Sequence, residues 1–460
     1  MVEIVERADV AELPLVPKNP LPYRRQLQAI RTFHTGTEML RDAGGPVTRC
    51  RLGPKWLMPE IVIATSPQGG RDILGRTDAF VEKTTVHAEM RNLMGENLFD
   101  TTHERWLPRK RTLQPIFTKK QVRAFAGHMT HAAEMVSERW LAGTQVDLDV
   151  ESRRLTMRAL GRSVLGIDLD EHADAIVEPM RVALSYIADR SLRPVRAPRW
   201  LPTLARHQAR TAVKTLRKLG YDILQGCRAD PTVDAPLIQA LIAARDPMTG
   251  HSLSDDDICN ELLVFLLAGH DTTATALTYA LWAIGKHQKI QERMAAEVDA
   301  IGDRALTPDD LPQLGYTTQV LQEALRLCPP AAMLGREALQ DMEVDGYRVK
   351  AGALVVYSIY AVHRDPSIWE DPLTFNPDRF SPERAKRRDR WQYLPFGGGP
   401  RSCIGDHFAM LEATLALATI VRRIEIRSAS EDFPMAVPFT TTAAAPILAE
   451  VHARTPDRDV

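Results

Sequence analysis

The chain has 460 residues and a formal net charge of −1; 44% of its residues are hydrophobic and 25% are charged. This balance gives the whole molecule no attraction to nucleic acid or to an anionic membrane, so neither is an expected partner. The five cysteines form no CxxC pair, which argues against a zinc ribbon, a thioredoxin-like redox pair and a disulfide framework and favours a reducing cytoplasm.

The N-terminal segment predicts neither a secretion signal nor a membrane anchor. It carries acidic residues early, prolines at positions 14, 17, 20 and 22, and no apolar run of signal-peptide length. Length alone suggests about three domains, but the chain shows no Gly/Ser-rich linker, low-complexity segment or internal repeat. We therefore expect a proline-rich arm at 1–20, one large domain at 21–452 and a tail at 453–460.

Hydrophobic periodicity predicts a mainly α fold with a minor β region. The segments 45–54 and 60–67 read as two short strands bounded by turn residues. Most of 120–330 shows apolar residues at helical spacing, and the β-branched run at 346–363 returns to a strand-like pattern.

A basic segment lies at 105–111. Trp106 and Lys110 are four residues apart in it and would share one face of a helix. A solvated basic face and a site for an anionic group are both compatible with this pattern.

The segment Leu262–Gly285 is long enough to span a bilayer, but His270 and Asp271 lie near its middle. An ionised residue there costs on the order of 3 kcal/mol in lipid, so we favour a helix buried inside a soluble protein. Ala268 and Thr272 share one face of this helix. The hydroxyl of Thr272 can bond to the carbonyl of residue 268 and Asp271 can simply be ion-paired, and sequence alone leaves this open against a chemical role.

Two segments upstream of residue 396 carry paired or clustered charges. Glu323 and Arg326 are three apart on a helix that the prolines at 329 and 330 end, and the segment Phe375–Phe380 contains Arg379. The run ERAKRRDR at 383–390 holds five basic residues. It is either a docking site for an acidic protein or a solvated loop.

The segment Phe396–Gly405, FGGGPRSCIG, precedes an amphipathic helical run. Cys403 therefore lies at or just before a helix N-terminus, where unpaired N–H groups and the helix dipole favour an ionised sulfur. The glycines at 397–399 let the backbone adopt positive φ and approach a flat ligand. A metal-bound thiolate fits this pattern, and a buried free cysteine is the simpler alternative.

Five positions of this loop match the FxxGxRxCxG haem-binding pattern of the cytochromes P450, the haem-thiolate monooxygenases: Phe396, Gly399, Arg401, Cys403 and Gly405. Residues 268–273 match the family's (A/G)-G-x-(D/E)-T-(T/S) motif in every specified position. The ExxR pair and the FxPxRF segment occur in the family's order ahead of the loop. The chain thus resembles a soluble bacterial member of that family.

The resemblance implies that haem b, iron protoporphyrin IX, binds between the long central helix and the cysteine-loop helix, with Cys403 as the iron ligand. Phe396 would pack under the sulfur. The residues implied to contact the rest of the cofactor or its propionates are Gly399, Arg401, Gly405, Arg336, Trp106, Lys110, Ala268 and Gly269.

Lys110 stands where the family usually has arginine. It keeps the charge but loses the bidentate fork, so Arg109 and Arg111 are candidates to replace it.

By the same resemblance, Asp271 and Thr272 are the catalytic acid and alcohol. Thr272 would hydrogen-bond the oxygen ligand of the iron, and Asp271 would deliver protons through water. Glu323, Arg326 and Arg379 would have a structural role beside the haem.

The implied reaction inserts one atom of dioxygen into a hydrophobic small molecule of the terpenoid, steroid, fatty acid or polyketide class. Because the chain has no flavin or iron–sulfur motif, electrons would come from NAD(P)H through a ferredoxin or flavodoxin and its reductase. Two alternatives stay open. One is a peroxide-driven or rearranging haem-thiolate enzyme, and the other is a non-enzymatic haem-dependent sensor or carrier.

Overall fold

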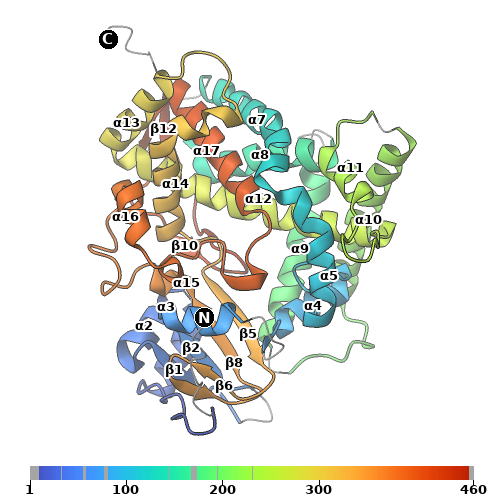
Figure 1. The fold of residues 1–460 in the computed structure, drawn as a ribbon, viewed down its shortest axis with the longest axis vertical. Coiled ribbons are helices and arrows are strands. Elements are labelled where there is room, and N and C mark those ends of the chain that lie inside the picture. Colours follow the sequence, from blue (N-terminus) through green and yellow to red (C-terminus); the bar gives the residue numbers. More distant parts are fainter. Residues whose placement is uncertain are drawn as a thin grey trace, which may run out of the picture.

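The computed structural model describes residues 10–454 except 33, 55–57, 77–80, 143–144, 167–172, 194 and 231. Figure 1 shows a large helical body above a smaller region built around a sheet. The predicted mainly α fold with a minor β region is confirmed. The principal helices of the body are α4 (Thr85–Met94), α5 (His103–Leu113), α7 (Ala126–Trp140), α8 (Leu148–Leu160), α9 (Ala173–Leu192), α10 (Leu204–Ala229), α11 (Pro236–Ala243), α12 (Asp255–Lys286), α13 (Gln288–Asp299), α14 (Gly315–Leu327) and α17 (Asp406–Arg423).

The sheet of the smaller region has the strand order β1-β2-β8-β5-β3. Strands β2 and β8 are parallel, with Val62 opposite Val355, and the other pairs are antiparallel. The two strands predicted near the N-terminus are confirmed as β1 and β2. The elements of this region are α1 (Tyr23–Thr32), α2 (His34–Gly44), β1 (Val47–Cys50), β2 (Ile61–Ala64), α3 (Pro67–Leu74), β3 (Val81–Glu82), β5 (Met333–Ala338) and β8 (Leu354–Ser358).

The strand prediction for 346–363 is right only in part. Strands β7 and β8 lie in this segment, but the chain then turns into the short helix α15 (Ile359–Val362). The Ser358 hydroxyl accepts a hydrogen bond from the Ala361 N–H and so caps this helix. The β-branched residues of the segment had predicted a strand here. The remaining strands are β4 (Gln145–Asp147), β6 (Met342–Val344), β7 (Tyr347–Val349), β9 (Ile424–Ser428), β10 (Met435–Ala436), β11 (Thr442–Ala443) and β12 (Leu448–Ala453).

Short helices complete the described chain, and several lie close to the cysteine loop. They are α6 (Lys119–Val122), α16 (Pro382–Arg387), the 3₁₀ turns Gln114–Phe117, Arg123–Phe125, Pro308–Gln313, Pro377–Phe380, Arg390–Gln392 and Gly399–Arg401, and a π-helical turn at Gly161–Leu165.

Helix α12 is the central element of the body and packs against α8, α10, α14 and α17. Ser254 starts it with a capping box, since its hydroxyl accepts from the Asp257 N–H and the Asp257 carboxylate accepts from the Ser254 N–H. The side chains at 258–267 and 273–281 are buried, but those at 268–272 are accessible to different degrees. The predicted buried helix is therefore confirmed, with an accessible stretch at its centre.

Within the described ranges, no helix is long and apolar enough to cross a membrane. The largest apolar core lies among the body helices, and two smaller cores lie on the faces of the sheet. The cysteine loop lies where these regions meet, because the residues before it pack in the sheet region and α17 packs in the body.

The described part of the predicted arm is packed rather than free. The Val16 N–H donates to the Arg348 carbonyl at 3.3 Å, and the Asn19 side chain donates to the Leu40 carbonyl at 2.8 Å. The division at residue 20 stays a prediction. Strand β12 ends at Ala453, and the end of the predicted tail, 455–460, lies outside the described residues.

Candidate active site

The cysteine loop is a tight turn that hydrogen bonds hold closed. The Cys403 N–H donates to the Phe396 carbonyl at 2.9 Å. Gly397 and Gly399 have φ of +71° and +70°, which confirms the predicted positive φ at two of the three glycines. Gly398 instead has φ −145°, and its small size serves packing, because a Cβ there would lie 2.8 Å from the Trp391 ring.

Cys403 is accessible, although protein surrounds it closely enough for burial to dominate its chemistry. Burial raises the pKa of its thiol to about 11, and the hydrogen bond from the Gly405 backbone lowers the pKa by less. The expectation that the helix end by itself favours a thiolate is therefore wrong for the free thiol. A metal ion that takes the sulfur as a ligand would supply the missing stabilisation.

Contacts connect the cysteine loop to the segment before α5, to β5 and, through that segment, to α12. Arg401 Nη1 donates to the Thr101 carbonyl at 2.8 Å and ties the cysteine loop to the segment before α5. That segment is tied to α12, since the Leu98 N–H donates to the carboxylate of Glu261 at 3.0 Å. A Cβ on Gly397 would lie 3.2 Å from Leu334 of β5. We infer that Cys403 faces a hollow enclosed by these segments.

Three of the predicted cofactor residues lie together beside the cysteine loop. The Arg401 guanidinium is 4.6 Å from the centre of the Trp106 ring, and Lys110 Nζ is 5.2 Å from it. Lys110 also donates to the Pro400 carbonyl. Burial and the nearby Arg401 charge lower the pKa of Lys110. An anionic group at this place would relieve the repulsion between the two cations, which is what the carboxylates of haem can do.

Arg336 and Arg401 both lie close enough to His87 for their charges to act on it. Burial, followed by the charges of Lys83, Arg336 and Arg401, holds the pKa of His87 well below its usual range. His87 lies in α4, with Nδ1 3.1 Å from the Thr84 hydroxyl, and its surroundings keep the imidazole neutral. The local sequence did not single it out, because two of its charged neighbours, Arg336 and Arg401, come from β5 and the cysteine loop.

Arg109 and Arg111 do not replace Lys110. Arg109 donates to the carboxylates of Asp257, at 2.9 Å, and Glu261. Arg111 forms two hydrogen bonds to Asp246. Successive residues on a helix point about 100° apart, so the neighbours of Lys110 face other elements.

The centre of α12 presents two faces with different surroundings. The Thr272 hydroxyl donates to the Ala268 carbonyl at 2.6 Å, so both residues lie on one side, where Ala268 is exposed and Thr272 half-buried. Gly269 is close to α8, because a Cβ there would lie 3.1 Å from Leu160. We infer that Ala268 and Thr272 border the same hollow as Cys403.

Asp271 and His270 point instead toward α8. The Asp271 carboxylate pairs with Arg153, which also binds Asp149 at 2.8 Å. His270 Nδ1 is 3.0 Å from the Thr156 hydroxyl, and burial lowers the pKa of His270 to about 4. Both simple interpretations of this motif are therefore present, since Thr272 bonds to residue 268 and Asp271 is ion-paired.

Glu323, Arg326 and Arg379 come together on the other side of the cysteine loop. Arg326 forms two hydrogen bonds to Glu323, at 2.7 and 2.8 Å, and neither side chain is exposed. Arg379 Nε lies 3.3 Å from the Glu323 carboxylate. The same carboxylate accepts from the Asn376 N–H at 2.9 Å. The predicted structural group is thus one buried ionic cluster.

His363 joins this cluster to the cysteine loop. Its Nδ1 is 3.3 Å from the Arg326 carbonyl, and its Nε2 is 3.0 Å from the Leu394 N–H. Burial and Arg326 lower the pKa of His363 to about 3, and these partners assign the proton to Nδ1. In the sequence, His363 stood out only as a polar residue at the end of an apolar run.

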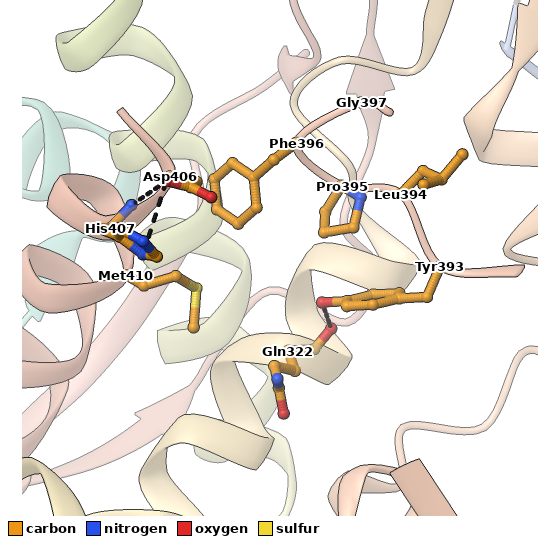
Figure 2. A pocket seen from close by; sticks show the side chains of 9 residues that line it. All are labelled: Gln322, Tyr393, Leu394, Pro395, Phe396, Gly397, Asp406, His407 and Met410. Carbon is orange, nitrogen blue, oxygen red and sulfur yellow. Dashed lines mark hydrogen bonds and ion pairs between the residues drawn. The ribbon is translucent and has the colours of Figure 1, made fainter. Parts of the chain in front are cut away.

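A pocket of about 280 Å³ lies beside the cysteine loop. Figure 2 shows it between Tyr393, Phe396 and the first turn of α17, with His407 and Met410 on one wall. The Tyr393 hydroxyl donates to the Gln322 carbonyl at 2.8 Å and fixes the ring against α14. The pocket gives an outside molecule a place to approach the loop.

The described residues contain no cluster of three or more His, Cys, Asp or Glu side chains that could hold a metal ion. Cys403 would therefore be the sole protein ligand of an iron, and a macrocycle would have to supply the others. The glycines of the loop, the paired cations near Trp106 and the accessible face of α12 all fit a flat anionic cofactor.

Comparisons with known proteins agree with this arrangement. The family model described as Cytochrome P450 matches residues 14–447. Cyclooctatin synthase of Streptomyces melanosporofaciens is 33% identical over 90% of this chain and 88% of that protein, and pentalenene oxygenase of Streptomyces avermitilis is 29% identical over 86% and 88%.

Among solved structures, the heme domain of a cytochrome P450DA mutant aligns with a TM-score of 0.83 and 25% identity, covering 96% of this chain and 98% of that one. The fold predicted from the sequence motifs is thus confirmed. The chain belongs to the cytochrome P450 family and is a cytochrome P450 monooxygenase.

Proposed function

We propose that this monooxygenase holds haem b through Cys403 and oxidises a lipophilic terpenoid-like molecule. The observation that carries the proposal is an accessible thiol in a closed loop whose contacts lead through the segment before α5 to α12. The names of the relatives pentalenene oxygenase and cyclooctat-9-en-7-ol 5-monooxygenase denote unsaturated carbon skeletons. They favour the terpenoid class over the steroid, fatty acid and polyketide classes.

Haem bound in the hollow supplies an iron at which dioxygen is activated. Cys403 binds the metal, and the closed loop from Phe396 to Cys403 fixes the direction of the sulfur. Lys110 and Arg401, which both lie close to the Trp106 ring, would bind the propionates together with Arg336. Gly399 allows the loop its conformation, and Ala268 keeps the facing side of α12 free of bulk, while Gly269 lets α12 approach Leu160 of α8.

In this proposal, Asp271 transfers a proton and Thr272 holds it. The Thr272 hydroxyl holds a proton on the accessible face of α12, where substrate and water can reach it. Asp271 is bound to Arg153, so it must exchange that partner for water before it can pass a proton to Thr272. Arg153 therefore controls when the carboxylate takes part.

Electrons reach the site from an acidic ferredoxin or flavodoxin that a reductase supplies from NAD(P)H. The partner docks beside the 280 Å³ pocket and the exposed cations of α16, Arg384, Lys386 and Arg387. Arg388 is not part of this surface, because its guanidinium lies over the rings of Trp369 and Phe380. All five cysteines are free thiols, which fits a cytoplasmic enzyme.

Replacing Cys403 by Ser tests the proposed ligand. We expect the reduced carbon monoxide complex to lose the red-shifted absorption band of a thiolate-bound haem. Cys227→Ser is the matched control, since Cys227 is a buried free thiol in α10 and its loss should leave the band unchanged. Retention of the band in Cys403→Ser contradicts the proposal.

Two assays separate this function from its alternatives. Turnover with a ferredoxin and its reductase, and none with peroxide alone, supports the monooxygenase, and the reverse result supports a peroxide-driven enzyme. A terpenoid library screened for a substrate-induced shift of the haem spin state then identifies the substrate. A shift with fatty acids only would contradict the terpenoid class.

A further inference from the structure

His87 of α4 combines two properties that also mark Cys403. Its side chain is accessible, and yet protein surrounds it so closely that burial is the main cause of its lowered pKa. Cys403 is accessible and densely surrounded in the same way. A group with both properties faces an internal space rather than the outer surface. Neither the proposed haem ligand nor the proposed proton path uses His87, so its position calls for a separate explanation.

Contacts at the start of α4 connect His87 to a wall of the hollow. The Thr84 hydroxyl lies 3.1 Å from Nδ1 of the imidazole, and a Cβ on Gly335 of β5 would lie 2.9 Å from the methyl carbon of Thr84. Leu334, the preceding residue of β5, is the side chain that a Cβ on Gly397 of the cysteine loop would approach. Thr84 thus holds the imidazole beside a strand that also contacts the cysteine loop.

Two phenylalanine rings continue from His87 toward α12. The centres of the His87 and Phe99 rings lie 5.0 Å apart, and the Phe439 ring lies 6.5 Å from that of Phe99. Phe439 lies in the connection between β10 and β11, where the Thr441 carbonyl accepts from the Thr275 hydroxyl of α12 at 2.8 Å. Both phenylalanines keep accessible surface. The three rings therefore form an aromatic row from α4 to a hairpin that is bonded to α12.

Among the described residues, the second ring nitrogen of His87, Nε2, has no hydrogen-bond partner. Nε2 is nevertheless not a buried atom. In a mostly apolar binding space, a few polar atoms with free hydrogen-bonding capacity fix the orientation of the ligand. His87 is such a group at the end of the aromatic row.

The charges around His87 decide which kind of ligand atom suits Nε2. The cations that act on the ring are Lys83, Arg336, Arg401 and Arg91. The ring itself stays neutral, and its positive surroundings attract an electron-rich atom. We therefore assign the Thr84 proton to the bond with Nδ1, which leaves the N–H of Nε2 to donate to an acceptor oxygen.

We propose that His87 is a substrate-binding residue whose Nε2–H donates a hydrogen bond to an oxygen atom already present on the lipophilic substrate. The rings of Phe99 and Phe439 would cover the adjoining carbon skeleton. This assignment rests on the proposed function, because it names the kind of terpenoid that the site accepts. A preceding oxidation, or a cyclisation that ends with the capture of water, must then supply the hydroxyl or carbonyl group of the substrate.

The haem propionates are the other oxygen acceptors expected in the hollow. Their proposed partners, Arg401, Lys110 and Arg336, are cations, whereas His87 is neutral. The contact of His87 with Phe99 favours the substrate, because an aromatic ring covers a carbon skeleton better than it covers a carboxylate. The test must still distinguish these two acceptors.

The experiment titrates the full-length holoenzyme with matched terpenoids and follows the shift of the haem spin state. Menthol differs from p-menthane, and cedrol from cedrane, by one hydroxyl group. The measured quantity is the affinity for the alcohol divided by that for its hydrocarbon. His87→Phe keeps an aromatic ring against Phe99 but has no donor, so we expect this ratio to fall about tenfold. The affinity for the hydrocarbons should stay at the parent value.

Two further variants sharpen the test. His87→Gln keeps an N–H group near the position of Nε2, so its ratio should lie between those of the parent and of His87→Phe. His287→Phe is the matched control, because the His287 ring also lies against a phenylalanine, Phe375, at 5.9 Å, but at the C-terminal end of α12. Its ratio should equal that of the parent. Haem transfer to apomyoglobin should proceed at the parent's rate in all three variants.

The possible failures have different meanings. An unchanged ratio in His87→Phe, or an equal fall in His287→Phe, would overturn the assignment of His87 and leave the proposed function intact. Faster loss of haem from His87→Phe than from His287→Phe would assign His87 to a propionate instead. If none of the four terpenoids shifts the spin state of the parent, the proposed terpenoid class fails, and the assignment of His87 fails with it.

Discussion

The two sides of the proposed haem site are built in opposite ways. On the cysteine side, Glu323 and Arg326 are fully buried and bonded to each other, to backbone and to Arg379. On the α12 side, Thr272 is half-buried, and its hydroxyl donates to the carbonyl one turn earlier in the helix. The groups on the cysteine side are excluded from water and bonded to several partners, whereas the hydroxyl that faces the substrate can exchange its hydrogen-bond partner.

This difference has an energetic basis. A buried charge without its partner is strongly destabilising, so the Glu323 cluster tolerates little change. An accessible hydroxyl can exchange a protein partner for water at small cost. We therefore expect substitutions on the cysteine side to act on folding and those on the α12 side to act on turnover.

The largest expected effect is that of Glu323→Gln, which removes the negative charge between Arg326 and Arg379. We expect the free energy of unfolding of the holoprotein to fall by about 3–5 kcal/mol, because two guanidinium groups lose a buried counter-charge. Urea denaturation monitored by circular dichroism measures it.

Glu178→Gln is the control variant. Glu178 and Arg181 form an ion pair with the same three-residue spacing as Glu323 and Arg326, but on the exposed face of α9. There we expect little or no loss of stability, because water already solvates both charges. Equal losses in the two variants would contradict the view that burial, rather than pairing, makes the cluster important.

A second expectation concerns the pH dependence of stability through His363. Its pKa is about 3 in the folded chain, against an ordinary value near 6.5. Between these values the unfolded chain binds the extra proton, so stability rises with pH, by at most about 1.4 kcal/mol per pH unit for this group.

His363→Gln should remove that part of the slope and lower stability at neutral pH by about 1–3 kcal/mol, because the bonds to the Arg326 carbonyl and the Leu394 N–H are lost or distorted. Chemical denaturation across mildly acidic pH measures both. An unchanged slope would mean that His363 is not the neutral bridge between the cluster and the loop.

The smallest effect on folding is expected for Thr272→Ala, with a loss below about 1 kcal/mol. Haem and substrate should still bind, but electrons should be diverted to hydrogen peroxide, and product formed per NAD(P)H should fall roughly tenfold or more.

Thr278→Ala is a close match, because the Thr278 hydroxyl makes the same kind of bond, to the Ala274 carbonyl at 2.8 Å, but is fully buried. The product that this variant forms per NAD(P)H should stay at the parent value. If product per NAD(P)H falls in both variants, or in neither, the accessibility of the hydroxyl does not explain the role of Thr272.

The sequence allowed the prediction of features that adjacent residues decide. Cys403 ahead of a helix, the helical pairing of Glu323 with Arg326 and the face shared by Ala268 and Thr272 all depend on the period of one element. The mainly α fold followed from the same periodicity.

What the sequence could not show depends on contacts between distant segments. Asp271 meets Arg153, which lies 118 positions earlier. His363 acquires its role only because the fold brings the Leu394 N–H to its ring. Arg388 looked like a surface charge and instead stacks on Trp369 and Phe380. Periodicity within one element carries no information about such partners.

Gly399 has a consequence for engineering. A Cβ at this position would lie 1.8 Å from the carbonyl oxygen of Leu74, the last residue of α3, so the loop that carries Cys403 is fitted directly onto a helix of the N-terminal region. A loop grafted from another relative will seat correctly only if that relative's version of α3 is transplanted with it. The smallest exchangeable module of this enzyme is therefore a discontinuous pair of segments more than three hundred residues apart.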